Sequence, residues 1–321
     1  MRCIFHGVFS KLFEAGPQPE PRTVGRLAKR LGDYQWAATT PVVAVHIMAI
    51  LGLVWAAMGW VPWEAWAACF VLYWIRMWGV TGGYHRYFAH RTYKTSRAFQ
   101  FVIAIIAQLG AQRGVLWWAA HHRDHHKYSD QERDVHSPTQ HGLMHAHIGW
   151  IYDHNGDTDY ERIKDMAKYP ELVFLNKLWF IPVVSLGIAS FLWLGWAGLF
   201  VTFAVNTVLI WHGTFTINSL SHVWGKPRYK TNEDSKNHWF LAIITMGEGW
   251  HNNHHHFMNS CRQGFFWWEV DATYYILKAM SWVGLVWDLK PPPARVYGQD
   301  LEDFAVSESD SAARGKTPRA A

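Results

Sequence analysis

The chain has 321 residues, of which half are hydrophobic and only 17% are charged. Its net charge is +5, and its apolar residues are bunched into runs separated by histidine-rich segments, a pattern typical of membrane proteins. The 21 tryptophans suit the belts that form at membrane–water interfaces. The three cysteines are scattered without a CxxC pair, so neither a disulfide framework nor a cysteine metal site is expected.

The first part of the chain predicts a helical hairpin. Residues 1–39 lack the apolar core of a signal peptide and are expected to form a cytoplasmic N-terminal segment. Residues 40–60 are apolar and long enough to cross a bilayer, which takes about 20 residues. A second apolar run at residues 65–80 follows a short turn and ends at Gly82 and Gly83.

The second half of the chain predicts another hairpin, with residues 178–194 and 196–217 joined by a turn at Gly195. Residues 98–120 are also apolar, but polar side chains interrupt them. If this middle segment crossed the membrane, the histidines before and after it would lie on opposite faces. We therefore expect it to be a helix at the interface or buried against the domain.

These runs predict an all-α integral membrane protein with four transmembrane helices in two hairpins and a cytosolic helical cap. The turns within the hairpins hold no Lys or Arg, whereas residues 22–30 and 86–97 are rich in them. By the positive-inside rule, both termini and the histidines lie in the cytoplasm. The membrane domain is expected to span residues 40–290. Residues 291–321, which begin with three prolines, are expected to be a disordered tail.

Three histidine clusters follow apolar runs, and their members are His85 and His90; His122, His125 and His126; and His251, His254 and His255. The second and third clusters have the form His-x-x-His-His, which places three imidazoles on one helical face. One imidazole can then serve one metal ion and its neighbour another. His85 and His90 are five residues apart and diverge on a regular helix. That segment is therefore expected to leave the helix at Gly82-Gly83 or to close on the site from two sides.

So many imidazoles predict a nitrogen-rich site for two metal ions. The Glu-x-x-His pairs of soluble carboxylate di-iron proteins are absent from the sequence. A structural zinc site would normally stop at four ligands, commonly with cysteine. Imidazole also suits zinc, copper and nickel, so the ligands alone do not name the metal. Metal ions held at a membrane surface indicate oxygen chemistry on a lipid.

From about residue 37 to 291 the chain resembles the membrane fatty acid desaturases, specifically the Δ9, stearoyl-CoA desaturase-like branch. The resemblance rests on the three clusters with their flanking residues, on Asn218-Ser-Leu-Ser-His222, and on Gly247-Glu-Gly-Trp before His251. In that family the implied iron ligands are His85, His90, His122, His125, His126, His222, His251, His254 and His255, with Asn218 binding through a water. The roles of His222 and Asn218 come from the resemblance alone.

The resemblance also implies substrate-binding residues. Gln112, Trp118 and Thr214 match residues that line the bend of the family's substrate tunnel, and Tyr73 and Met77 match positions near its closed end. A methionine there would shorten the tunnel and favour C16 over C18 chains. Trp118 and Met77 can also be read as ordinary core residues, and for Met77 the two readings weigh about equally.

The implied activity is the O2-dependent insertion of a cis double bond, at Δ9, into a saturated C16 or C18 acyl chain by a centre of two Fe²⁺ ions. Haem, flavin and iron–sulfur motifs are absent from the sequence, so a separate ferredoxin-like or cytochrome b5-like protein must supply electrons. A basic rim could attract that donor or the phosphates of coenzyme A, and it comprises Arg86, Arg91, Lys94, Arg97, Arg123 and Lys127. These charges adjoin membrane helices, so nucleic-acid binding is not expected. The acyl carrier (coenzyme A, acyl-carrier protein or lipid) stays open.

Two other functions fit part of the pattern. A membrane hydroxylase or alkane monooxygenase shares the histidine clusters, but the motifs around Asn218 and Gly247 favour desaturation. A metal transporter or sensor would place its polar groups within the spans. Here the clusters follow the apolar runs, and only His46, Arg76 and His212 interrupt them.

Overall fold

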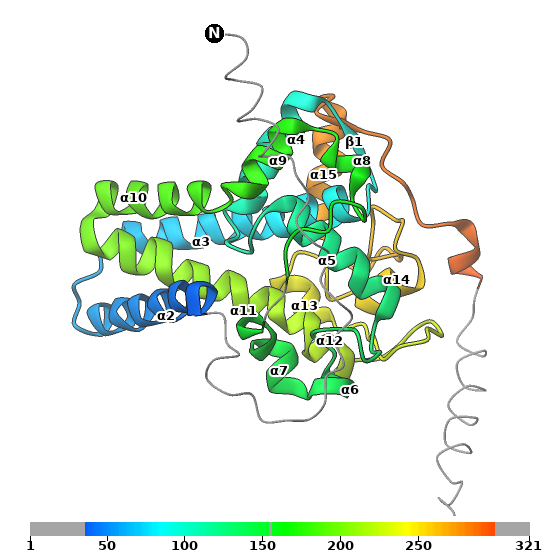
Figure 1. The fold of residues 1–321 in the computed structure, drawn as a ribbon, viewed down its shortest axis with the longest axis horizontal. Coiled ribbons are helices and arrows are strands. Elements are labelled where there is room, and N and C mark those ends of the chain that lie inside the picture. The colour runs from blue at the N-terminus through cyan, green and yellow to red at the C-terminus, as the bar shows by residue number, and fades with distance from the viewer. Residues whose placement is uncertain (1–35, 154–155, 299–321) are drawn as a thin grey trace, which may run out of the picture.

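The computed structural model describes residues 36–153 and 156–298, and this part of the chain is mostly helical (Figure 1). The strands of its one small sheet, β1 (Lys94–Thr95) and β2 (Val286–Trp287), pair antiparallel. The predicted cytoplasmic segment at residues 1–39 lies mostly outside the described residues. The all-helical prediction is therefore confirmed apart from this two-residue pairing.

Helices cover each of the four predicted spans. Helix α2 (Trp36–Ala57) is followed by α3 (Trp63–Trp78), and α10 (Phe180–Ala197) by the π-helix η4 (Gly198–Val205) and α11 (Asn206–Asn218). The chain reverses at the end of α10, where Gly195 has a φ of 59°, so the turn lies where the sequence predicted it. These helices run side by side (Figure 1).

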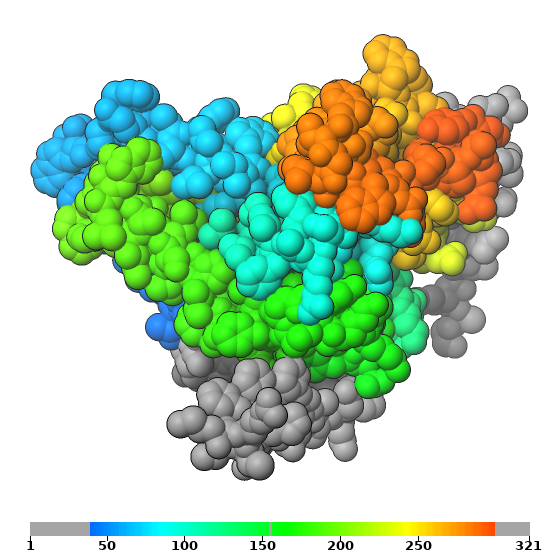
Figure 2. Space-filling view, turned by 90° about the horizontal axis from the view of Figure 1, so that it is seen from above, coloured from blue at the N-terminus to red at the C-terminus, as the bar shows by residue number. Residues whose placement is uncertain are grey.

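Two described helical stretches are long and apolar enough to cross a membrane, Thr39–Ala57 and Phe180–Val223, and the second contains the reversal at Gly195. Large apolar side chains cover the outside of the hairpins: Ile50 is 59% exposed, Phe70 64% and Leu192 77%. Figure 2 shows α3 and α10 extending on the left, away from the broader part of the molecule. An exposed apolar surface of this extent indicates a contact with lipid or with another apolar partner.

A buried arginine joins the hairpins to the rest of the fold. Arg76 of α3 is fully buried and donates to the carbonyl of Leu109 and to the side chains of Asn206 and Thr207 on α11. A guanidinium buried among apolar helices has to find such acceptors, because an unpaired buried charge is costly. These bonds fix the end of α3 against the start of α11.

The predicted middle helix is two helices, α4 (Arg97–Gln108) and α5 (Val115–Tyr128). The chain breaks between them, where Ala111 and Arg113 have φ angles of 57° and 68°. Asn176 stabilises the new start, because its side-chain oxygen accepts from the backbone N–H groups of Leu116 and Trp117. The prediction of a single helix over residues 98–120 was therefore wrong, although α4 packs against the rest of the protein as expected.

After α3 the chain continues as a π-helix, η2 (Gly79–Ala89). Glycines allow η2 to lie close to α4: a Cβ on Gly79 would stand 2.5 Å from the carbonyl oxygen of Ile106, and one on Gly83 3.0 Å from the Cβ of Ala107. The prediction that the helix ends at Gly82 and Gly83 was wrong. Both glycines lie inside the helix and serve its packing.

Short helices make up the cap, and they are α6 (Pro138–His141), α7 (Leu143–His147), η3 (Gly149–Tyr152), α8 (Lys164–Ala167), α9 (Pro170–Lys177), α12 (Leu220–Val223), α13 (Trp239–Ile244), α14 (His251–His256), α15 (Ala272–Trp282) and η5 (Ala294–Tyr297). Residues 291–298, where the sequence predicted the start of a disordered tail, include the helix η5. Val296 in η5 is buried, and its carbonyl accepts from the Tyr229 hydroxyl. Residues 299–321 lie outside the described part of the chain.

Candidate metal centre

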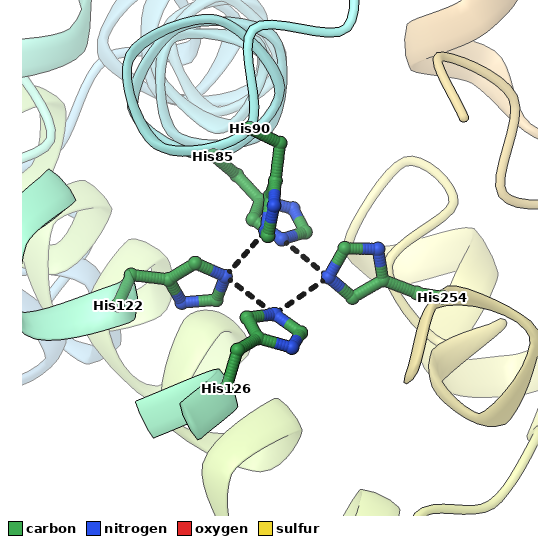
Figure 3. A group of neighbouring side chains, drawn as sticks. All are labelled: His85, His90, His122, His126 and His254. Carbon is green, nitrogen blue, oxygen red and sulfur yellow. Dashed lines mark hydrogen bonds between the residues drawn. The ribbon is translucent and has the colours of Figure 1, made fainter. Parts of the chain in front are cut away.

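Five imidazoles from three segments converge on one point, and we call them the five-histidine group: His85, His90, His122, His126 and His254. Their rings point toward a common centre (Figure 3). Their Nε2 atoms are closely spaced, with 2.9 Å between His90 and His122, 3.0 Å between His122 and His126, 2.9 Å between His126 and His254, and 3.0 Å between His254 and His85.

The π-helix explains how His85 and His90 can share this group. In η2 the N–H of His90 donates to the carbonyl of His85, five residues earlier. The i→i+5 bond gives a wider turn than an α-helix, and such turns occur frequently at functional sites. The two rings, which would diverge on an α-helix, have centroids only 4.8 Å apart.

Four further imidazoles form a second cluster, the four-histidine group: His125, His222, His251 and His255. It includes the 3.2 Å approach of the Nε2 atoms of His222 and His251. The groups adjoin each other, because α5 and α14 each contribute to both. His126 and His255, from opposite groups, have ring centroids 4.5 Å apart. Neighbouring histidines on one helix therefore lie in different groups, as their spacing in the sequence predicted.

Carboxylates orient the histidines from outside, and the sequence analysis missed them. The Nδ1 of His125 contacts Asp134 at 3.0 Å, and that of His222 contacts Asp130 at 2.8 Å. In the other group, the Nδ1 of His85 contacts Glu248 at 2.5 Å. Such partners fix the ring orientation and direct Nε2 toward a metal ion. Glu248 and Asp130 stood among the motif residues that flank the clusters, but they were given no role.

The charge states of these side chains suit metal binding. Burial lowers the pKa of His90, His122, His126 and His254 well below the usual 6.5, and neighbouring histidines lower it further. Burial also lowers the pKa of His125, but Asp134 outweighs this effect and the pKa is raised. Burial raises the pKa of Asp134, while His125 and His136 lower it more, so this carboxylate stays ionised. The four lowered pKa values favour neutral imidazoles, the form that binds a metal ion, whereas at His125 a bound ion would have to displace a proton.

The two groups fit metal ions on geometric grounds. Two nitrogens bound at a right angle to one ion, each about 2.1 Å from it, are about 3.0 Å apart, which matches the spacing in the five-histidine group. In the four-histidine group, the Nε2 of His255 is buried without a hydrogen-bond partner. A buried imidazole nitrogen without a partner is costly unless something else binds it.

An apolar cavity reaches both groups. It is lined by Met77, Val80, Thr81, His85, Trp118, His122, His125, Thr214, Ile217, Asn218, Thr245, Glu248 and His251. Asn218 lines this cavity together with His251, and its role as a water-mediated ligand stays a prediction.

The predicted bend residues lie together at this cavity. Trp118 donates to the side-chain oxygen of Gln112 at 3.1 Å, and the amide of Gln112 donates to Thr214 at 2.9 Å. Trp118 also stacks on the ring of His122, with centroids 4.8 Å apart. Met77 lines the cavity, whereas Tyr73 lies behind it and donates to the carbonyl of Ile244.

The prediction that six basic residues form a positively charged rim around the histidines was wrong in part. Arg86 is fully buried and pairs with Glu248 and Asp271 beneath the centre. Four others form ion pairs with three carboxylates: Arg91 and Arg123 share Asp165, Lys94 pairs with Asp288, and Arg97 pairs with Glu171. Lys127 instead lies over the ring of Tyr128. The positive charge near the histidines is therefore much weaker than the sequence indicated.

Comparisons with known proteins agree with this site. The family described as fatty acid desaturase matches residues 61–283. The chain is similar to "Delta-9 acyl-lipid desaturase 2" of Arabidopsis thaliana, with 34% identity over 82% of this chain and 84% of the relative. It is also similar to "sn-1 stearoyl-lipid 9-desaturase" of Synechocystis sp. (34%, 80% and 81%) and to "Acyl-CoA C20 Delta5-desaturase" of Anemone leveillei (36%, 72% and 75%). The chain belongs to the fatty acid desaturase family and is an oxidoreductase that desaturates fatty acyl chains.

Proposed function

We propose that the protein is an O2-dependent Δ9 desaturase that holds one iron ion in the five-histidine group and a second in the four-histidine group, with Asn218 binding through water. The observation that carries this proposal is the division of nine histidines into two adjoining groups beside one apolar cavity. When bound, the two irons supply the oxidising power that removes hydrogen from unactivated carbons, which no side-chain base could do.

The chain's own residues would bind and position the acyl chain. The cavity walls are apolar except near the histidines, so they suit a saturated hydrocarbon and exclude water. The hydrogen-bonded row Trp118–Gln112–Thr214 gives this wall a fixed shape beside His122. Holding reacting groups at a fixed distance lowers the barrier by several kcal/mol in general. We assign the choice of carbon atoms to this row and the closed end of the cavity to Met77 and Tyr73.

The membrane arrangement belongs to the same proposal. The apolar outer faces of α2, α3 and α10, with the apolar η4–α11 segment packed among them, support four crossings in two hairpins, with both termini and the metal centre in the cytoplasm. The carbons of a membrane lipid or acyl-CoA could then enter from the bilayer side. Electrons would come from a separate ferredoxin-like or cytochrome b5-like protein.

The position of the double bond is also proposed. The relatives include desaturases named for Δ9, Δ7 and Δ5 positions and for acyl-lipid and acyl-CoA substrates, and an acetylenase named for an acyl-carrier-protein substrate. The Δ9 assignment agrees with the motif resemblance and with the names of the Arabidopsis and Synechocystis relatives.

Expression in a host unable to make unsaturated fatty acids tests the proposal. We expect growth without added oleate and a cis C16:1 or C18:1 product whose double bond lies at carbon 9 by mass spectrometry. The His125→Ala variant is the matched negative control. Hydroxy acids in place of monounsaturated acids would identify a hydroxylase, and metal flux without lipid products would identify a transporter. Purified protein should contain two irons per chain, and one iron would contradict the site.

A further inference from the structure

A second set of histidines lies outside both groups. His46 of α2, His212 of α11 and His147 of α7 come from three segments that meet at the lower edge of the hairpins (Figure 1). The Nε2 atoms of His46 and His212 are 3.2 Å apart, and the Nε2 of His147 is 2.9 Å from the Nδ1 of His212. The three rings form a row, not a cluster around one point.

Hydrogen bonds extend this row at both ends. At the outer end, the Nδ1 of His46 donates to the carbonyl of Val42 at 2.8 Å. At the inner end, the Nδ1 of His147 is 3.0 Å from the hydroxyl of Ser219, which in turn donates to the carbonyl of Phe215 at 2.7 Å. The row therefore runs without a break from one backbone carbonyl to another.

Counting hydrogens shows that the row is one proton short. Five consecutive hydrogen bonds join Val42 to Phe215 through these side chains, and each bond needs one hydrogen. Three neutral imidazoles and one hydroxyl supply only four, because a neutral imidazole has one N–H. Both end acceptors are carbonyls and cannot supply the fifth. One added proton would complete every bond.

The missing hydrogen can sit at different places in the row. If the hydroxyl of Ser219 turns to His147, all three imidazoles are satisfied and the bond to Phe215 is lost. If it turns to Phe215, the two facing nitrogens of His46 and His212 lack a proton. A change of tautomer in His147 and His212, together with rotation of the Ser219 hydroxyl, interconverts these patterns, while His46 keeps its hydrogen on Nδ1. Burial lowers the pKa of His147, so an added proton is held weakly there.

The inner end of the row adjoins the metal centre. Ser219 is fully buried, and its carbonyl accepts from the backbone N–H of His222 at 3.3 Å. It follows Asn218, which lines the cavity with His125 and His251. The outer residue, His46, is only half-buried. A proton taken up near His46 can thus be delivered beside the four-histidine group.

We propose that His46, His212 and His147 form a proton relay that ends at Ser219 and supplies oxygen reduction at the metal centre. This inference rests on the proposed function. Desaturation removes two hydrogens from the acyl chain and reduces O2 to two waters, which consumes two electrons from the donor protein and two protons from outside. The relay provides these protons one at a time and takes up another after each transfer.

The test uses the iron-loaded full chain with the variants His147→Gln, His212→Gln and His46→Gln. Glutamine keeps a side chain that can hydrogen-bond but cannot take up and pass on a proton. His145→Gln, on α7 as is His147 but outside the row, is the matched control. Iron content, KM for the acyl substrate, kcat, the solvent isotope effect and peroxide released per O2 consumed are measured for each.

We expect the relay variants to keep their iron and KM while kcat falls on the order of 100-fold, at the low end of what positioned proton donors contribute. The solvent isotope effect and the released peroxide should both rise, because oxygen reduction then waits for protons. Relay variants that match His145→Gln in kcat and peroxide would overturn the relay. Loss of iron in the relay variants alone would also overturn it, in favour of a structural role.

The same measurements separate failure of the relay from failure of the proposed function. A wild-type protein that makes hydroxylated lipid would refute desaturation, but its peroxide fraction would still test the relay. A wild-type protein that consumes no O2 would refute both.

Discussion

The two histidine groups lie side by side, but they are held in different ways. In the five-histidine group the π-helix η2 and the packing of η2, α5 and α14 set the positions, and only His85 contacts a carboxylate, Glu248. In the four-histidine group, carboxylates hold the rings: Asp134 on His125, Asp130 on His222, and Glu233 3.6 Å from His255. Backbone winding fixes one group and hydrogen bonding fixes the other.

The largest effect is expected when one ligand is removed from a single group. His125→Ala should abolish product formation, an effect beyond the roughly 10- to 100-fold loss typical of removing a supporting partner. Iron should fall from two toward one per chain, since the five-histidine group keeps all its members. Product chromatography and iron analysis check this. His121→Ala is the control, because His121 stacks on Trp117 outside both groups. Normal product from His125→Ala would refute the proposed site.

A smaller effect is expected when only the supporting carboxylate is changed. Asp134→Asn should lower iron affinity or activity by about 10- to 100-fold, because the amide no longer orients His125 as an anion does. Asp124→Asn is the matched control, since Asp124 pairs with Arg133 and Arg162 on the surface. Iron retention against a chelator measures the difference. Equal retention in the two variants would show that hydrogen bonding does not hold this group.

Acid should release metal progressively, with the five-histidine group contributing most. Burial lowers the pKa of His90, His122, His126 and His254 below 6.5, so the folded chain favours their neutral forms. A group with a lowered pKa contributes stability that is present above pH 6.5 and is lost as the pH falls. Iron content and thermal unfolding measured between pH 7.5 and 5 check the sign. Unchanged activity well below pH 5 would contradict it.

The smallest expected effect concerns selectivity and not the rate. Met77 is fully buried and lines the cavity, and its Cε would stand 3.0 Å from a Cβ on Gly213. Met77→Ala should lengthen the cavity and shift the products from C16:1 toward C18:1, with iron content unchanged. Gas chromatography of the total fatty acids measures the ratio. An unchanged product profile would place the end of the cavity elsewhere.

The sequence predicted the features that depend on local spacing. His122, His125 and His126 divide between the groups as their helical spacing implies, and the chain turns at Gly195 as expected. His222 and Asn218 were found only through the family resemblance, because one histidine in an apolar helix has no distinctive spacing.

The features that the sequence missed depend on contacts between distant segments. Asp130 reaches His222 across 92 positions, and Glu248 reaches His85 across 163, so no local pattern pairs them. The burial of Arg86 was missed for the same reason, since its partners Glu248 and Asp271 come from the far end of the chain. The break between α4 and α5 depends on Asn176, which caps a helix some 60 residues before it.

The winding of η2 has a consequence for copying or altering this site. The spacing of five between His85 and His90 works only with an i→i+5 turn, whereas the spacing of four between His122 and His126 belongs to an ordinary α-helix. Deleting one residue between His85 and His90 would let the segment relax to α-helical winding and would also re-register everything downstream. A designer who transplants the pair onto an ideal scaffold should therefore shorten the interval, and should not preserve the natural motif letter for letter.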